Sequence, residues 1–148
     1  MREILFKGKS LDNGKWVEGF YLQMSETNEN YQVTTNHYIS YMGTEPGIFS
    51  RRMYTRSFPK WLIHKAVDPE TVCQYTGLKD KNGEKIWEND IVKFINDEGD
   101  ESFYKVSMID GKWCTTYKND FPEPLCNDNY QLICAGNVFD NSELLKEE

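Results

Sequence analysis

The chain has 148 residues, of which 28% are charged and 14% aromatic, and its formal net charge is −7. This length allows one ordinary domain or two very small ones. Because no apolar run approaches the roughly 18 residues of a transmembrane helix, and because charges recur within residues 1–7, we expect a soluble cytoplasmic protein with no signal peptide and no membrane contact.

The first half predicts short strands separated by polar turns. Asn13-Gly14 is a dipeptide suited to a tight turn, since both residues tolerate positive φ. Polar residues predict a loop at 25–30, and Pro46 predicts another at 43–47. The strands expected around these turns are 4–6, 16–22, 31–35, 38–42 and 61–67.

Residues 48–58 combine arginines with aromatic residues. Such a combination can stack on single-stranded nucleic acid. The acidity of the whole chain opposes that interpretation, and contact with the acidic second half or with another subunit is the favoured alternative. The candidate binding residues in this segment are Arg51, Arg52, Tyr54 and Arg56.

Asp68-Pro69-Glu70 interrupts the strand pattern, because Pro69 fixes its own φ and biases Asp68 away from helix. We therefore predict a boundary between an N-terminal β unit at 1–67 and a C-terminal barrel-like unit at 68–148, with one intertwined domain as the alternative. The balance of charge is +3 in the first part and −10 in the second. Opposite charges favour contact within a chain or head-to-tail between copies, although the acids could equally serve only solubility.

The stretch Tyr75–Phe94 contains more turn and strand signals than any other part of the chain. Asn82-Gly83 predicts a tight turn, Glu88–Asp90 a polar corner and Ile91–Phe94 a strand, with Trp87 filling the core. A turn precedes a tryptophan at three places, Trp16, Trp87 and Trp113. This recurrence indicates a chain built from hairpins.

The remaining residues continue the hairpin pattern. A hydrophilic turn at 96–101 and an irregular loop at 119–129 flank a hairpin turning at Asp110-Gly111. A last strand at 130–138 is expected to bulge at Gly136. Asn141-Ser142 should cap a final helical turn whose two leucines, Leu144 and Leu145, dock on the body or on a neighbour. We predict a mainly β fold of antiparallel hairpins forming small β-barrel- or sandwich-like units.

Residues that could ligate metals or act in catalysis are few and scattered. No Cys-x-x-Cys pair occurs, and we expect four reduced thiols, no metal and no cofactor. A carboxylate enzyme could use Glu88 and Asp90 or the acids of 97–101, but nothing in the sequence indicates the cleft that would shift one of their pKa values. The cysteines and histidines are Cys73, Cys114, Cys126, Cys134, His37 and His64.

Residues 68–94 resemble the YopX family of phage and prophage proteins. The resemblance rests on Asp68–Val72, Gln74–Gly83 and Ile86–Val92, and extends to the opening Gly8–Ser10 with Asn13–Gly19 and to the end. The family more often has Tyr and Gly where this chain has Trp87 and Asn89, and Pro where it has Ser142. The resemblance implies an essentially all-β, phage-borne protein of unassigned biochemical role that can form homo-oligomers in the cytoplasm of a bacterial host.

These observations favour a non-enzymatic accessory protein that oligomerises and binds a host or phage macromolecule. No catalytic residue is predicted, since neither histidine has a motif that would pair it with a nucleophile. The alternative is a small β-barrel that binds single-stranded nucleic acid through residues 48–58.

Overall fold

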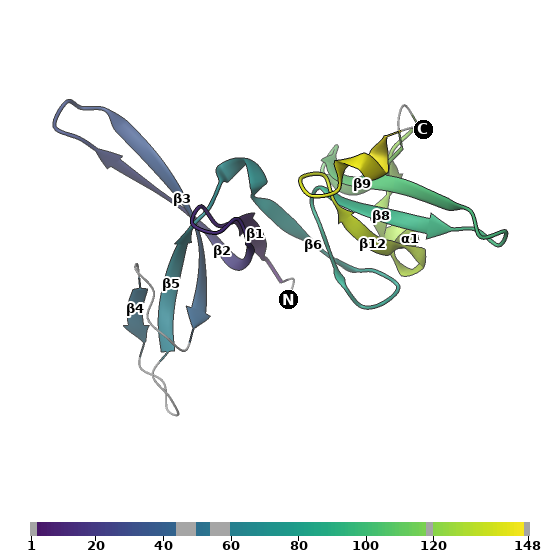
Figure 1. Cartoon of the computed structure of the whole chain (residues 1–148), viewed down its shortest axis with the longest axis horizontal. Coiled ribbons are helices and arrows are strands. Elements are labelled where there is room, and N and C mark those ends of the chain that lie inside the picture. The colour runs from purple at the N-terminus through teal and green to yellow at the C-terminus, as the bar shows by residue number, and fades with distance from the viewer. Residues whose placement is uncertain (1–2, 44–49, 54–59, 118–119, 147–148) are drawn as a thin grey trace. The chain divides into compact units, whose positions relative to one another are not determined.

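The computed structural model describes residues 3–43, 50–53, 60–117 and 120–146. The chain divides into two compact units (Figure 1). The N-terminal unit comprises residues 4–73, and the C-terminal unit comprises residues 74–148 together with residues 1–3. The predicted boundary, between residues 67 and 68, lies within the N-terminal unit near its end.

Both units consist mainly of antiparallel strands, which confirms the predicted fold class. Neither sheet closes into a barrel within the described residues. Of the two forms predicted, barrel-like and sandwich-like, the structure is therefore consistent with the sandwich-like one. The strands are β1 (Phe6–Lys9), β2 (Trp16–Thr27), β3 (Val33–Gly43), β4 (Ser50–Met53), β5 (Lys60–Ala66), β6 (Cys73–Lys79), β7 (Lys85–Trp87), β8 (Asp90–Ile95), β9 (Glu101–Ile109), β10 (Lys112–Thr116), β11 (Glu123–Pro124) and β12 (Ile133–Asn137).

The sheet of the N-terminal unit is built around the long hairpin of β2 and β3, and within this unit the strand order is β4-β5-β3-β2-β1. The prediction of separate strands at 31–35 and 38–42 was wrong, because Asn36 and His37 pair with Met24 and Gln23 and so continue the ladder. The predicted loop at 25–30 is also displaced. The turn lies at 28–32, where the Asn28 side chain accepts hydrogen bonds from two backbone N–H groups.

The core of the N-terminal unit is small. Ile39 and Val67 are almost fully buried, and Tyr38 and Ile63 are also buried. Gly19 is required where β2 meets β3, because a Cβ atom there would lie 2.2 Å from the Ser40 carbonyl oxygen. Glycine therefore allows the two backbones to approach closely at the base of the hairpin.

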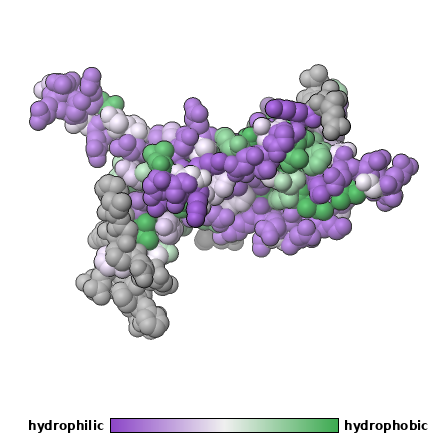
Figure 2. Space-filling view, in the orientation of Figure 1, coloured by the Kyte–Doolittle hydropathy of each residue, from purple (hydrophilic) through white to green (hydrophobic). Residues whose placement is uncertain are grey.

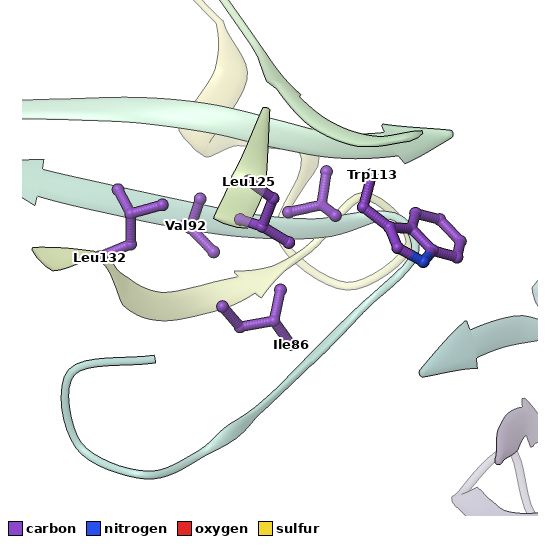
Figure 3. Packing of buried hydrophobic residues seen from close by; sticks show 6 residues of the cluster. Ile86, Val92, Trp113, Leu125 and Leu132 are labelled. Atoms are coloured by element: carbon purple, nitrogen blue, oxygen red, sulfur yellow. The ribbon is translucent and has the colours of Figure 1, made fainter. Parts of the chain in front are cut away.

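The C-terminal unit has a five-stranded sheet in the order β11-β10-β9-β8-β12. The hairpin of β6 and β7 precedes this sheet in the chain. A row of buried side chains forms its core, with Leu132 at one end of the row and Trp113 at the other (Figure 3). Phe94 and Tyr104 are half-buried and pack against this row. The buried residues of the core are Ile86, Val92, Val106, Trp113, Leu125 and Leu132.

The turn and the corner predicted within Tyr75–Phe94 are both present. Gly83 adopts a φ of 82°, and Asn89 adopts a φ of 64° at the corner. Trp87 is 4% exposed, and its ring centroid lies 5.5 Å from that of Tyr75, the residue opposite it on β6. The Asp90 carboxylate accepts a hydrogen bond of 2.9 Å from the Trp87 backbone N–H, which fixes the corner.

The end of the chain departs from the prediction in detail. The region expected to be an irregular loop, 119–129, contains β11 and the short helix α1 (Leu125–Asp128). The last strand, β12, is shorter than predicted, because the helical turn η2 (Asn129–Gln131) occupies its expected beginning. Its register shifts between Cys134 and Gly136, as expected for a bulge.

The final helical turn, η3 (Ser142–Leu145), is present as predicted, and it contacts β9. The predicted side-chain cap is absent, because the Asn141 amide oxygen accepts a hydrogen bond from the Asn137 N–H instead. The remaining helical turn, η1 (Pro69–Thr71), follows the extended residue Asp68. No helix in the described ranges is both long and apolar enough to cross a membrane.

Candidate functional site

The predicted binding residues fall in a part of the chain that the structure describes only partly. Arg51 and Arg52 lie on β4, where their backbones pair with Leu62 and Trp61 of β5. Tyr54 and Arg56 lie outside the described residues. The structure therefore places two of the four candidates side by side on one strand.

The two histidines each hydrogen-bond a hydroxyl on a neighbouring strand. His37 pairs with Tyr21, and His64 Nδ1 lies 2.7 Å from the Ser40 hydroxyl. Sequence reasoning missed both pairs, since they appear only once the registers β2–β3 and β3–β5 are known. Within the described residues neither imidazole forms an ion pair with a carboxylate, the third group that a hydrolytic triad uses to orient its histidine.

The acidic residues considered for catalysis have local structural partners. Asp90 fixes the corner through the Trp87 N–H. Burial raises the pKa of the Glu88 carboxyl. A hydrogen bond with the Gln74 backbone and the positive charge of Lys105 act in the opposite direction but do not cancel this effect. In the turn at 96–101 the Asn96 side chain accepts hydrogen bonds from two backbone N–H groups, and this tip is hydrophilic (Figure 2). No cluster of metal-ligating side chains occurs in the described part of the chain.

The most exposed element of the N-terminal unit is the outer part of the β2–β3 hairpin. We call residues 23–35 the β-arm, all of which are exposed. Figure 1 shows this hairpin extending beyond the other strands of its unit. The sheet pairs β2 with β1 only at 16–19, and β3 with β5 only from residue 38 onward. Within the described residues, both outer edges of the β-arm are therefore open.

The C-terminal unit has a groove where its core ends. One hollow of about 220 Å³ is lined by Phe94, Tyr104 and Leu132 on its apolar side, and by Thr115, Glu123 and Asp128. A second hollow of about 390 Å³ shares Tyr104, Thr115 and Glu123 with the first, and adds aromatic and acidic residues of the following loop. We call these two hollows together the open-end groove.

The open-end groove was not predicted from the sequence. The residues of its first hollow come from β8, β9, β10, β11 and the α1–η2 segment with Leu132 after it, and each strand alone has an ordinary pattern of alternating side chains. The one sequence signal was the excess of acid in the second part of the chain.

Comparison with known proteins identifies the family and the fold. The YopX protein family model matches residues 5–146. The crystal structure of protein EF1440 from Enterococcus faecalis is similar over 99% of this chain and 100% of that one, with a TM-score of 0.58 and 17% sequence identity. At this identity the similarity establishes a shared fold alone. No curated protein matches the sequence. Since the family model covers nearly the whole chain, the protein belongs to the YopX family.

Proposed function

We propose that this protein is an oligomeric, non-enzymatic interaction module that uses its β-arm to pair with strands of another subunit. The observation that carries the proposal is the β-arm itself, which is exposed along residues 23–35 and has both outer edges open in the described part of the chain. The family resemblance supports a phage-borne setting, with a host or phage macromolecule as the further partner.

An isolated two-stranded ribbon is only marginally stable in water. Its open edges present unpaired N–H and C=O groups that a further strand can satisfy. Natural edges are often protected by lysine or proline, but the β-arm contains no Lys, Arg or Pro. The strand residues Met24 and Val33 are 39% and 65% exposed, and the side chains of an added strand would cover part of them.

The charge distribution supports association between copies. The excess of basic residues before residue 68 and of acidic residues after it favours a head-to-tail arrangement. A non-enzymatic role is consistent with the hydrogen bonds of Asp90 and of the two histidines. Asp90 bonds the corner at Trp87, and each histidine bonds a hydroxyl on a neighbouring strand.

The test shortens the β-arm. Ser25 and Thr35 are paired on opposite strands, so replacing residues 26–34 with Asn-Gly would close the hairpin at that pair. We expect wild-type protein to be a multimer by light scattering at micromolar concentration, and the shortened protein to be a monomer that is still folded by circular dichroism.

The matched control shortens a different hairpin tip. Ile95 and Glu101 form the last pair of β8 and β9, so residues 96–100 can be replaced in the same way. This variant should keep the wild-type mass. A strictly monomeric wild type, or a shortened β-arm variant that stays multimeric, would contradict the proposal.

Single-stranded nucleic acid is the second candidate ligand, through the basic and aromatic residues of 48–58. Affinity for an oligonucleotide that falls steeply with salt would support this alternative. An absence of binding at low salt would remove it.

A further inference from the structure

The open-end groove contains a polar group without a protein partner. The Thr115 side chain is only 7% exposed, and its hydroxyl forms no hydrogen bond with any residue that the structure describes. Among the described residues, only Trp113 Nε1 is a fully buried side-chain N or O atom without a hydrogen-bond partner. The Thr115 hydroxyl is therefore accessible from the groove. Thr115 lines both hollows of the groove. Buried hydroxyls normally have partners, so this one is placed to bond a group that enters the groove.

The groove has a negative rim. Glu123 borders both hollows, Asp128 borders the first and Asp120 the second. None of the three carboxylates forms an ion pair with a described residue, and no described Lys or Arg lines either hollow. A cation would therefore find unpaired carboxylates here, whereas a phosphate would be repelled.

The walls of the groove are aromatic. Phe94 and Tyr104 line the first hollow, and Tyr117 and Phe121 line the second. The rings of Tyr104 and Tyr117 meet edge to face, with centroids 5.8 Å apart and planes at 61°. Phe121 is 92% exposed at the outer end. Aromatic faces attract organic cations, and arginine in particular stacks on them.

The size of the first hollow suits a side chain. Its volume of about 220 Å³ holds about seven waters at roughly 30 Å³ each. The first hollow thus has room for one long side chain, and the second hollow, which shares three lining residues with it, extends the groove.

We propose that the open-end groove binds an arginine side chain presented by a basic segment of a partner protein. The guanidinium would donate hydrogen bonds to the Thr115 hydroxyl and to the carboxylates of Glu123 and Asp128, with its plane against Tyr104. Arginine fits better than lysine because its planar group has five donors in a fixed fork and stacks on rings. The proposal does not depend on the proposed pairing through the β-arm, which lies in the N-terminal unit.

The test is an NMR titration of the full chain with a blocked Gly-Gly-Arg-Gly-Gly peptide. We expect saturable shifts of the backbone amide signals of Thr115 and Leu132. The matched peptide with citrulline, which has the same shape without the charge, should bind at least about tenfold more weakly, since charge-assisted hydrogen bonds are about twice as strong as neutral ones. Equal binding of the citrulline peptide would overturn the proposal, as would shifts confined to other residues.

Two variants test the groove residues. Thr115→Val keeps the shape of the side chain, and we expect it to weaken arginine binding about threefold to tenfold through loss of one hydrogen bond. Asp128→Asn should weaken it by a similar factor, whereas Asp97→Asn, which removes one charge at the hydrophilic turn outside the lining of the groove, should not. An equal effect of Asp97→Asn would reduce the binding to non-specific charge attraction and overturn the proposal.

Occupation of the groove by a second copy of this chain is tested by dilution. The Thr115 and Leu132 signals of the free protein should stay unchanged over a tenfold dilution. If they move towards new positions on dilution, the groove is filled by the protein itself, and the proposal of a foreign partner fails.

Discussion

Asp80 connects the turn at residues 80–84 to strand β12. Its side chain is 6% exposed and accepts backbone hydrogen bonds of 2.8 Å from Asn82, 2.9 Å from Glu84 and 2.9 Å from Cys134. The last donor is 54 positions away in the sequence. One carboxylate therefore closes a local turn and holds it against the sheet.

We predict that Asp80→Asn lowers the free energy of unfolding by about 2–3 kcal/mol, because an amide cannot accept all of these bonds and hydrogen bonds to charged groups are the stronger ones. Urea denaturation near neutral pH would measure the change. The exposed-turn variant Asp97→Asn is the control, and its effect should stay within about 0.5 kcal/mol.

The advantage of Asp80 should depend on pH. Burial alone raises the pKa of this carboxyl, but the N–H donors of Cys134, Glu84 and Asn82 outweigh it and hold the pKa below its usual value of 3.8. Since the folded pKa is below the unfolded one, the contribution is present above about pH 4 and is lost as the pH falls through the folded pKa. The difference between wild type and Asp80→Asn should therefore shrink towards about pH 2, and a constant difference would contradict this account.

The four thiols should differ in reactivity according to their surroundings. Cys73 and Cys114 are buried and Cys126 is exposed. Burial, together with the nearby carboxylates of Asp90 and Asp80, raises the pKa of the half-buried Cys134 thiol well above its usual range. Because the thiolate is the reactive form, we predict one fast reaction with Ellman's reagent in the native protein. Cys126→Ser should remove that fast phase, and its persistence in the variant would show that another thiol is accessible.

At the scale of elements, the hairpin of β2 and β3 changes character along its length. Near its base, Gly19 lies against the Ser40 carbonyl and Ile39 is fully buried. Beyond residue 23 the two strands pair, among the described residues, only with each other, from Met24–Asn36 to Thr27–Val33. The outer half thus lacks the buried contacts that stabilise the inner half.

We predict that hydrogen exchange reveals this difference. Amides of the β-arm should exchange by local opening at low protein concentration, because ribbons with exposed hydrogen bonds belong to the least stable part of a fold. Their protection should rise with concentration if the β-arm pairs with another subunit. The β8–β9 tip serves as the control and should exchange at a constant rate, and concentration-independent exchange of the β-arm would count against its role in assembly.

At the scale of the whole molecule, local sequence was enough for the fold class and for the corner at residues 88–90. Gly83 and Asn89 adopt the positive φ values that their residue types favour, and those choices need no distant partner. The continuity of β3 was not predictable in the same way. Asn36 and His37 have low strand propensity, and their place in the ladder depends on the opposite strand.

The candidate site was beyond sequence reasoning for a related reason. Phe94, Thr115 and Asp128 meet only because β8, β9, β10 and the α1–η2 segment come together at one end of a sheet. The orphan hydroxyl of Thr115 has no counterpart in any sequence pattern, since a threonine in a strand is unremarkable by propensity. Sequence indicated only the acidity of the region.

The separation of the β-arm tip from the core also has a practical consequence. The turn at residues 28–32 is closed by its own hydrogen bonds, since the Asn28 N–H donates to the Gln32 carbonyl and the Tyr31 N–H donates to the Asn28 carbonyl. Its side chains are exposed. Exposed hairpin tips of this kind tolerate inserted sequence. An epitope or a fluorescent label grafted between Asn28 and Gln32 should leave both cores intact and report directly on what approaches the end of the arm.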